Sequence, residues 1–160
     1  MPKTPKSSSS KLSSHINSSK TKKASKGGSA QAFAQDCVVL FMEMLMMVKL
    51  YHWKTYGYAQ HKATDEFYGS LNGHVDEFIE VLMGKAVMRI DLMKHKKVQL
   101  LDLPSSSVKD LTKHLEHFKA ALIKMENHPF IKSNHSTDLL NIRDEILGDL
   151  NQLSYLLTLE

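Results

Sequence analysis

The chain has 160 residues, 42% hydrophobic and 24% charged, so it can bury one domain-sized core. Its single cysteine excludes an internal disulfide, and seven glycines with four prolines are few for the many turns of an all-β protein. No secretory signal is expected, because the first 30 residues lack an apolar stretch. The most apolar run, between Asp36 and Lys49, is interrupted by Glu43 and is too short to span a bilayer.

The net charge of +4 is unevenly distributed. Residues 1–30 are rich in Ser and Lys and contain no acid, whereas residues 31–160 hold 14 basic and 17 acidic side chains, a net charge of −3. Such a tail has almost nothing to bury, so residues 1–30 are predicted to be disordered. Its lysines suit sequence-independent binding of nucleic acid through phosphates; the alternatives are a solubilising tail or a nuclear-import signal. They are Lys3, Lys6, Lys11, Lys20, Lys22, Lys23 and Lys26.

Residues 31–56 are predicted to form the first helix of the body. The segment is apolar on almost every side over residues 38–48, and a helix that is apolar all round is buried all round. In a protein of this size, that pattern indicates packing against a second subunit as well as against the chain's own bundle. Gly57 separates this helix from a second predicted helix over residues 58–88.

Residues 89–104 are predicted to form a connection whose length suits a long crossover better than a tight hairpin. Ser107 is expected to cap a third helix with Asp110 as its capping-box partner, and Pro129 to end that helix. A fourth helix is predicted to open at 136–137. Apolar residues step by three and four along both helices: Leu111, Leu115, Phe118, Leu122 and Met125, then Leu139, Ile142, Ile146, Leu150, Leu153 and Leu157. The pattern predicts an all-α, ferritin-like four-helix bundle over residues 31–160.

Four potential metal ligands lie on one side of the second predicted helix. With about 100° per residue and His61 at 0°, Asp65 lies near 40°, Asp76 near 60° and Glu80 near 100°. Each pair, His61 with Asp65 and Asp76 with Glu80, is spaced i, i+4 and can share an ion. The two pairs are roughly 16 Å apart along the axis, whereas metal–ligand bonds are about 2 Å long. They cannot share one ion within a chain.

The face becomes complete if a second copy of the helix lies antiparallel across a twofold axis near residues 70–71. The first pair of one subunit then meets the second pair of the other. Gly69 and Gly73 lie near that axis on the same face. Glycine costs about 1 kcal/mol in a helix interior, and close approach of two backbones is a reason to accept it. The sequence therefore predicts a symmetric dimer with two sites at its interface.

The ligand types favour particular metals. Carboxylates with some imidazole suit iron or manganese, whereas structural zinc sites favour thiolates, which this face lacks. The alternative interpretation is a solvated helix face that happens to carry charge, because acidic residues spaced i, i+4 are common on surface helices.

The sequence HWKTYG at residues 52–57, followed by HKATDEFYGSLNGHVDEFIE at residues 61–80, resembles the Dps family, the mini-ferritins (DNA-binding proteins from starved cells). The His-x3-Asp-x10-Asp-x3-Glu spacing matches the family without a gap, and a weaker likeness extends over residues 31–160. The resemblance implies a hollow shell of twelve subunits that protects against oxidative stress. Ferrous iron would be oxidised between twofold-related subunits, often by hydrogen peroxide, and stored as ferric mineral. Some members bind DNA through N-terminal lysine arms.

The resemblance also implies which residues would bind iron. His52, His61 and Asp65 would come from one subunit, and Asp76 and Glu80 from its twofold mate, with the last four as the ferroxidase residues. One departure concerns His52, because eight residues separate the two histidines here and the family usually has eleven. His52 is therefore either a ligand reached through a tighter turn or a packed core histidine.

Three hypotheses follow from these patterns. The first is a Dps-like ferroxidase that stores iron and coats DNA, in a cytoplasm or nucleoid. The second is a non-enzymatic ferritin-like protein with a vestigial metal face, which compacts nucleic acid in a nucleus or packs inside a virus particle. The third is another di-metal carboxylate enzyme, although the usual Glu-x-x-His repeats are not evident. Trp53 would intercept oxidants beside the site or, alternatively, be a core aromatic.

Overall fold

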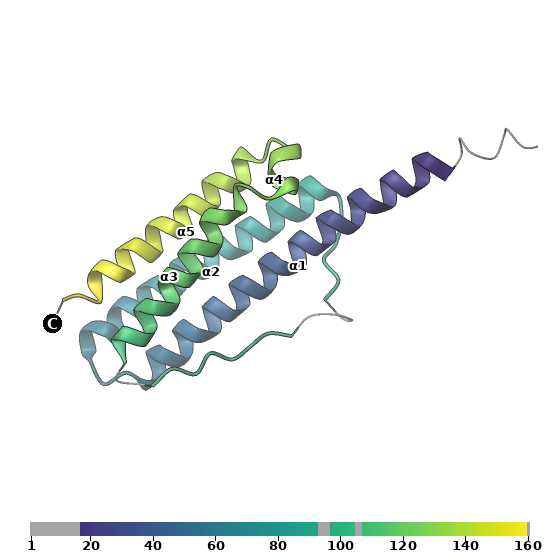
Figure 1. Ribbon diagram of the computed structural model, residues 1–160. Coiled ribbons are helices and arrows are strands. Elements are labelled where there is room, and N and C mark those ends of the chain that lie inside the picture. The colour runs from purple at the N-terminus through teal and green to yellow at the C-terminus, as the bar shows by residue number, and fades with distance from the viewer. Residues whose placement is uncertain (1–16, 93–96, 105–106, 160) are drawn as a thin grey trace, which may run out of the picture.

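The structure, a computed structural model, describes residues 17–92, 97–104 and 107–159. The only regular secondary structure among these residues is helical, so the predicted all-α bundle is confirmed (Figure 1). None of the helices in the described ranges is both long enough and apolar enough to cross a membrane. The elements are α1 (Asn17–Lys54), α2 (Tyr58–Ala86), α3 (Val108–Met125), the short α4 (Pro129–Ser133) and α5 (Thr137–Leu156).

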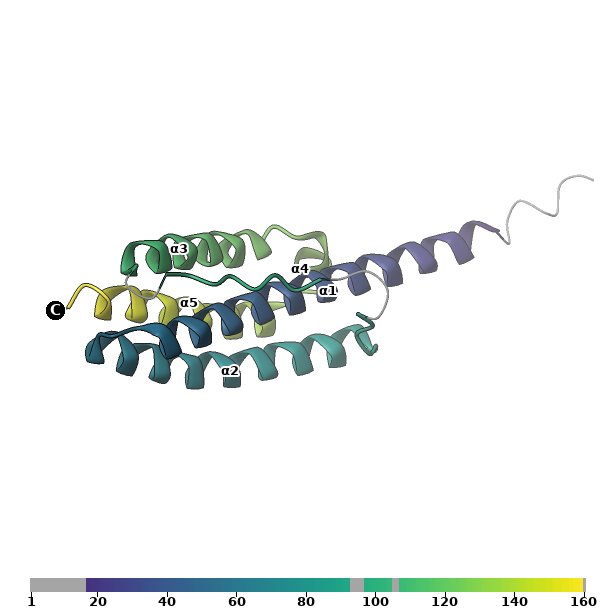
Figure 2. The same cartoon turned by 90° about the horizontal axis from the view of Figure 1, so that it is seen from below.

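The direction of each helix follows from the connections. α1 and α2 form an antiparallel hairpin, and α2 also packs against α5 (Figures 1 and 2). The connection after α2 runs back along α1: the carbonyl of Asp91 accepts a hydrogen bond from Gln35, and the carbonyl of Leu103 accepts one from Lys54, at the far end of α1. The chain thus returns to the end of the bundle where α2 began. As a result, α2 and α3 point in the same direction (Figure 1).

The first helix is longer than predicted. α1 begins at Asn17 rather than at Gln31 and ends at Lys54. Residues 17–30, which were predicted to be disordered, are helical and extend beyond the rest of the bundle (Figure 1). Once the packed residues have formed a helix, each added residue gains one hydrogen bond at little cost, so the helix continues into a polar segment. The remainder of the predicted disordered tail, residues 1–16, lies outside the described residues.

The apolar surface of α1 is covered partly from within the chain. Its core side includes Tyr51, which is completely buried. On the outer side, the backbone N–H of Gln99 in the connection donates a hydrogen bond to Glu43 at 3.0 Å. The connection therefore accounts for some of the burial that was predicted to need a second subunit. Met42, next to Glu43, remains 39% exposed.

The ends of the later helices agree with the sequence analysis except at Pro129 and in the second half of the predicted capping box, because the Ser107 backbone N–H donates to the Pro104 carbonyl rather than to Asp110. Ser107 caps α3, because its Oγ accepts a hydrogen bond from the Asp110 backbone N–H at 3.1 Å. α5 opens at Thr137 as predicted. Pro129 does not end α3, which stops at Met125. Pro129 is instead the first residue of α4. A backbone N–H at this position has no acceptor within the helix, so a proline, which has no N–H, loses no hydrogen bond there.

The core lies between the facing sides of the four long helices. The apolar stripes predicted for the third and fourth helices are buried. α2 contributes one buried stripe of its own, which leaves its opposite face in contact with solvent. That stripe consists of Ala63, Thr64, Phe67, Leu71, Val75, Phe78 and Leu82.

Cys37 is expected to be unreactive in the folded protein. Its side chain is 2% exposed, and burial, followed by the nearby charge of Asp36, raises the pKa of the thiol far above its ordinary value. The thiolate is the reactive form, and burial makes it both scarce and inaccessible. Alkylation of Cys37 at pH 8 should therefore be at least about 100-fold slower in the folded protein than in the unfolded chain. Labelling with iodoacetamide in buffer and in denaturant tests this. Equal rates would mean that this part of α1 is open to solvent.

Candidate metal centre

Two histidines meet at the turn between α1 and α2. His52 lies in the last turn of α1 and His61 in the first turn of α2, and residues 55–57 join the helices. Their imidazole rings stack with centroids 3.9 Å apart and 23° between the ring planes. His52 is 7% exposed, whereas His61 is at the surface. The short turn, which left His52 as either a ligand or a core histidine in the sequence analysis, brings it directly against His61.

Both imidazoles use Nδ1 for hydrogen bonds to the backbone. His52 Nδ1 lies 3.0 Å from the His61 carbonyl oxygen, and His61 Nδ1 lies 3.2 Å from the His52 carbonyl oxygen. A carbonyl oxygen only accepts, so each Nδ1 must hold the proton and donate. In the neutral rings, each Nε2 then presents a free lone pair. Metal-binding histidines are commonly oriented by a hydrogen bond of this kind from the other ring nitrogen.

Thr64 supports the same proton arrangement on His52. Its Oγ1 donates to the Gln60 carbonyl at 2.7 Å, as a helical threonine often does. The lone pairs of that oxygen are then free to accept from His52 Nδ1, 3.3 Å away. Thr64 is completely buried, so this contact is shielded from water.

Asp65 completes this group of side chains. Its Oδ1 lies 3.7 Å from His52 Nε2, and its side chain is 52% exposed. A carboxylate oxygen and an unprotonated Nε2 are both acceptors, so they attract each other only through a shared proton or cation. A cation with bonds of about 2.1 Å to both atoms would join them at an angle of about 120°. The pair can therefore hold one ion without moving apart.

Lys49 lies beside this carboxylate, although the sequence analysis did not identify it. Its Nζ is 3.9 Å from Asp65 Oδ1 and 4.6 Å from the centroid of the Tyr68 ring. The ammonium group thus balances part of the negative charge of Asp65. The sequence contains one signal for this contact: Lys49 ends the most apolar run and lies three residues, about one helical turn, before His52.

Trp53 is not a core aromatic, the alternative that the sequence analysis left open. Its side chain is 68% exposed, because two residues turn a helix by about 200° and Trp53 therefore lies on the side of α1 away from the buried Tyr51. The Lys49 ammonium lies 5.9 Å from the Trp53 ring. Since the chain has one tryptophan, its fluorescence reports on this group of residues alone.

Asp76 and Glu80 lie apart from this group. Both are exposed on the outer face of α2, as Asp65 is, but Asp76 is roughly 16 Å further along the helix. Within the described part of the chain, no three His, Cys, Asp or Glu side chains are arranged to hold a metal ion. The chain therefore carries two separate pairs of candidate ligands: an upper pair, His61 and Asp65, with His52 behind it, and a lower pair, Asp76 and Glu80.

The surface between the two pairs is open. A Cβ atom added to Gly69 or to Gly73 would meet nothing within 4 Å. Packing within the chain therefore does not require glycine at either position. The result is a low, polar strip along α2 that joins the upper pair to the lower pair.

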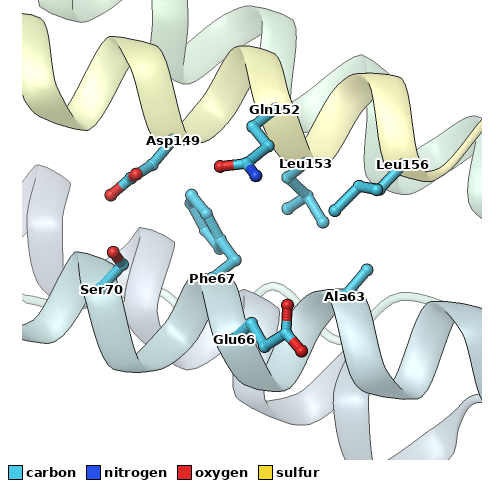
Figure 3. A pocket seen from close by; sticks show the side chains of 8 residues that line it. All are labelled: Ala63, Glu66, Phe67, Ser70, Asp149, Gln152, Leu153 and Leu156. Carbon is cyan, nitrogen blue, oxygen red and sulfur yellow. The ribbon is translucent and has the colours of Figure 1, made fainter.

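A small hollow lies elsewhere on α2, on the side that faces α5 (Figure 3). Its volume is about 90 Å³, and Asp149 at its edge lies 3.0 Å from His74 Nδ1. None of the five predicted ligands lines it, so it is separate from the candidate centre. Its lining residues are Ala63, Glu66, Phe67, Ser70, Asp149, Gln152, Leu153 and Leu156.

The fold and these side chains define an all-α bundle with a candidate site for divalent metal at the surface of α2. The chain belongs to DUF5856, a family of unknown function, whose match covers residues 52–157. The matched segment begins at His52 and contains all five predicted ligands. Searches against curated proteins and against solved structures gave no significant match.

Proposed function

We infer that this protein is a Dps-like ferroxidase, which oxidises ferrous iron at sites shared between two subunits and stores the ferric product in an oligomeric shell. The paired histidines support this proposal most strongly. His52 and His61 hold each other through Nδ1, which leaves both Nε2 atoms available to a metal beside Asp65. A solvated helix face without function does not need this arrangement.

The path of the chain also supports the proposal. A long connection returns along the bundle between the second and third helices, so these two helices run in the same direction (Figure 1). Ferritin-like bundles have one such crossover. The sequence motif of residues 52–80 resembles that of the Dps family on the same helices.

The separation of the two ligand pairs supports a shared site. His61 and Glu80 are equally far from the midpoint between residues 70 and 71, and so are Asp65 and Asp76. Two α2 helices that cross antiparallel at this midpoint would place each pair opposite the complementary pair. The open strip at Gly69 allows the backbones to approach closely. The assembly is a dimer at minimum and, in the proposed shell, a dodecamer.

The chemistry assigned to these residues is simple. Iron is the substrate, and the carboxylates with the two imidazoles bind it and favour the more highly charged ferric product. Two ferrous ions give one electron each to hydrogen peroxide. With two protons, the peroxide is reduced to two molecules of water.

Iron oxidation in the presence of peroxide tests the function. The variant Asp76→Ala/Glu80→Ala is expected to lose at least 100-fold in the rate of ferric absorbance increase, in line with loss of first-sphere ligands. The matched control is Glu66→Ala/Glu77→Ala, which removes the same charge from exposed positions of α2 outside the ligand face. If the first variant oxidises iron as fast as the control, the proposed ferroxidase activity is wrong.

The basic tail is proposed to bind DNA. Each lysine that contacts a phosphate contributes about −0.9 to the slope of log K against log salt concentration. Replacing the seven tail lysines by glutamine should therefore flatten that slope by several units and abolish most binding at 0.1 M salt. A variant with arginine at the same seven positions keeps the charge and should bind like the wild type. Gel-shift titrations at two salt concentrations measure both; equal binding by the glutamine variant would exclude the tail as the DNA-binding element.

One observation favours a second candidate function. The Lys49 ammonium already lies beside Asp65, and a lysine can replace the charge of a metal in a site that has lost its activity. On that basis, the chain would be a non-enzymatic ferritin-like protein with a structural or nucleic-acid-compacting function. Binding of Co²⁺ to the wild-type protein distinguishes the two, because a vestigial site would not bind it at micromolar concentration.

A further inference from the structure

An exposed aromatic residue lies at the start of α2. The side chain of Tyr58 is 78% exposed, a large fraction for a tyrosine in a helix. Eighteen residues separate Tyr58 from Asp76, which is five complete helical turns, so the two residues occupy the same angular position on α2. Tyr58 therefore belongs to the outer face that bears the ligand pairs.

A groove lies on the same face at the other end of α2. It is shallow and wide open to solvent, and it is lined by residues 83–84 and 87–89. Met83 follows Asp65 by eighteen residues and so shares its angular position. Gly84 leaves the groove open, since an added Cβ atom would meet nothing within 4 Å.

Val87, on the rim of this groove, is unusual in two ways. Its backbone has φ 51° and ψ 51°, the left-handed conformation that closes α2. A β-branched residue is disfavoured there by roughly 1–2 kcal/mol, and glycine is the usual choice. Val87 is also 90% exposed, so contacts within the chain do not offset that cost. An apolar side chain kept at a strained and exposed position indicates a contact outside the subunit.

The symmetry of the ligand pairs relates the aromatic residue to the groove. Tyr58 precedes the midpoint between residues 70 and 71 by as many residues as Met83 follows it, and Gly57 and Gly84 are related in the same way. An antiparallel crossing that joins His61 to Glu80 therefore also brings Tyr58 over Met83. Methionine sulfur and aromatic rings make favourable contacts.

The charges on the outer face agree with the same crossing. The exposed residues Asp76 and Glu80 make the second half of this face acidic. Lys62, which is exposed near the start of α2, falls opposite Ile79 and next to Glu80 in this register. The antiparallel arrangement thus places Lys62 beside Glu80 and sets Asp65 opposite Asp76, where the metal of the proposed site would balance the two carboxylates, whereas a parallel one would set the acidic halves together.

We propose that Tyr58 of one subunit docks into the groove at the end of α2 of a second copy, against Met83 and Val87. The contact occurs twice in the dimer, once on each side of the twofold axis. The proposal rests on the shared site of the proposed function, because it uses the same crossing. It adds the apolar anchors that hold the two metal half-sites in register.

Cysteine cross-linking in the full-length protein tests the contact. Equimolar Tyr58→Cys and Met83→Cys variants, refolded together and oxidised with diamide, should form a disulfide-linked dimer. Each variant alone should not, because residues 58 and 83 are roughly 37 Å apart along one helix. The matched control is Ala59→Cys with Met83→Cys: Ala59 is also exposed but points about 100° away around α2. The native thiol of Cys37 is buried and does not interfere.

At least tenfold more linked dimer is expected from the Tyr58/Met83 mixture than from the control. If sedimentation analysis shows a dimer but both mixtures give the same yield of disulfide-linked dimer, the docking contact is wrong and the proposed iron chemistry is left intact. A protein that stays monomeric at every concentration would overturn the docking contact as well. Loss of both the dimer and iron oxidation would overturn the proposed function too.

A double-mutant cycle tests the contact without new cysteines. Tyr58→Ala and Val87→Ala should each weaken dimerisation about tenfold, as truncation of an aromatic anchor or its pocket does. The combined variant should be hardly weaker than either alone if the side chains touch across the interface. If the two positions do not touch, their free-energy changes should add, and the combined variant should dimerise about a hundredfold more weakly than the wild type. That result would contradict the contact.

Discussion

Two variants that are each inactive are expected to recover iron oxidation when they are combined. One variant, His61→Ala/Asp65→Ala, lacks the upper pair, and the other, Asp76→Ala/Glu80→Ala, lacks the lower pair. In an antiparallel dimer, each site takes one pair from each subunit. A mixed dimer therefore contains one site with all four side chains and one site with none.

The size of the recovery follows from random pairing. Half of the dimers in an equimolar mixture are mixed, and each has one of its two sites intact, so about a quarter of the wild-type rate is expected from an isologous interface. The variants are refolded together, and the initial rate of ferric absorbance increase is measured after addition of ferrous iron and peroxide. Each variant refolded alone is the control. A mixture that is no faster than the two separate proteins would show that the site is not shared, even if both variants are inactive.

Much of the helical fold could be predicted from the sequence, because apolar side chains repeat every three or four residues in the parts that pack. Leu111 and Leu115 in α3, for example, lie where that spacing places them, in the core. The start of α1 could not be predicted in this way. Residues 17–30 have no apolar stripe, and their helix continues from packed residues further along the chain rather than from a pattern of their own.

The candidate site was only partly predictable, for a related reason. Helical spacing placed Asp65, Asp76 and Glu80 on one exposed face of α2, where the structure has them. The position of His52 depends on how tightly the chain turns between two helices, and side-chain spacing does not describe a turn. The contact between His52 and His61, and the ion pair of Lys49 with Asp65, are tertiary features of that turn.

Replacement of Lys49 by glutamine is expected to raise the affinity for divalent metal about tenfold. The Lys49 ammonium lies 3.9 Å from Asp65 Oδ1, so an ion that binds this carboxylate must displace or repel it. Two unit charges at 4 Å interact by about 1 kcal/mol in water and about 4 kcal/mol at an effective dielectric constant of 20. Because Asp65 is about half exposed, the lower part of this range applies, and 1.4 kcal/mol corresponds to a factor of ten.

The fluorescence of Trp53 provides the measurement. Co²⁺ is used because it is stable to oxidation, and it should quench Trp53 beside the site, with the midpoint of the titration about tenfold lower in Lys49→Gln, as the charge interaction implies. The matched control is Lys132→Gln, which removes the same charge from an exposed position in α4 at the other end of the bundle. A midpoint that shifts equally in both variants would assign the effect to net charge alone. A midpoint unchanged in Lys49→Gln would show that the ammonium does not compete with metal for Asp65.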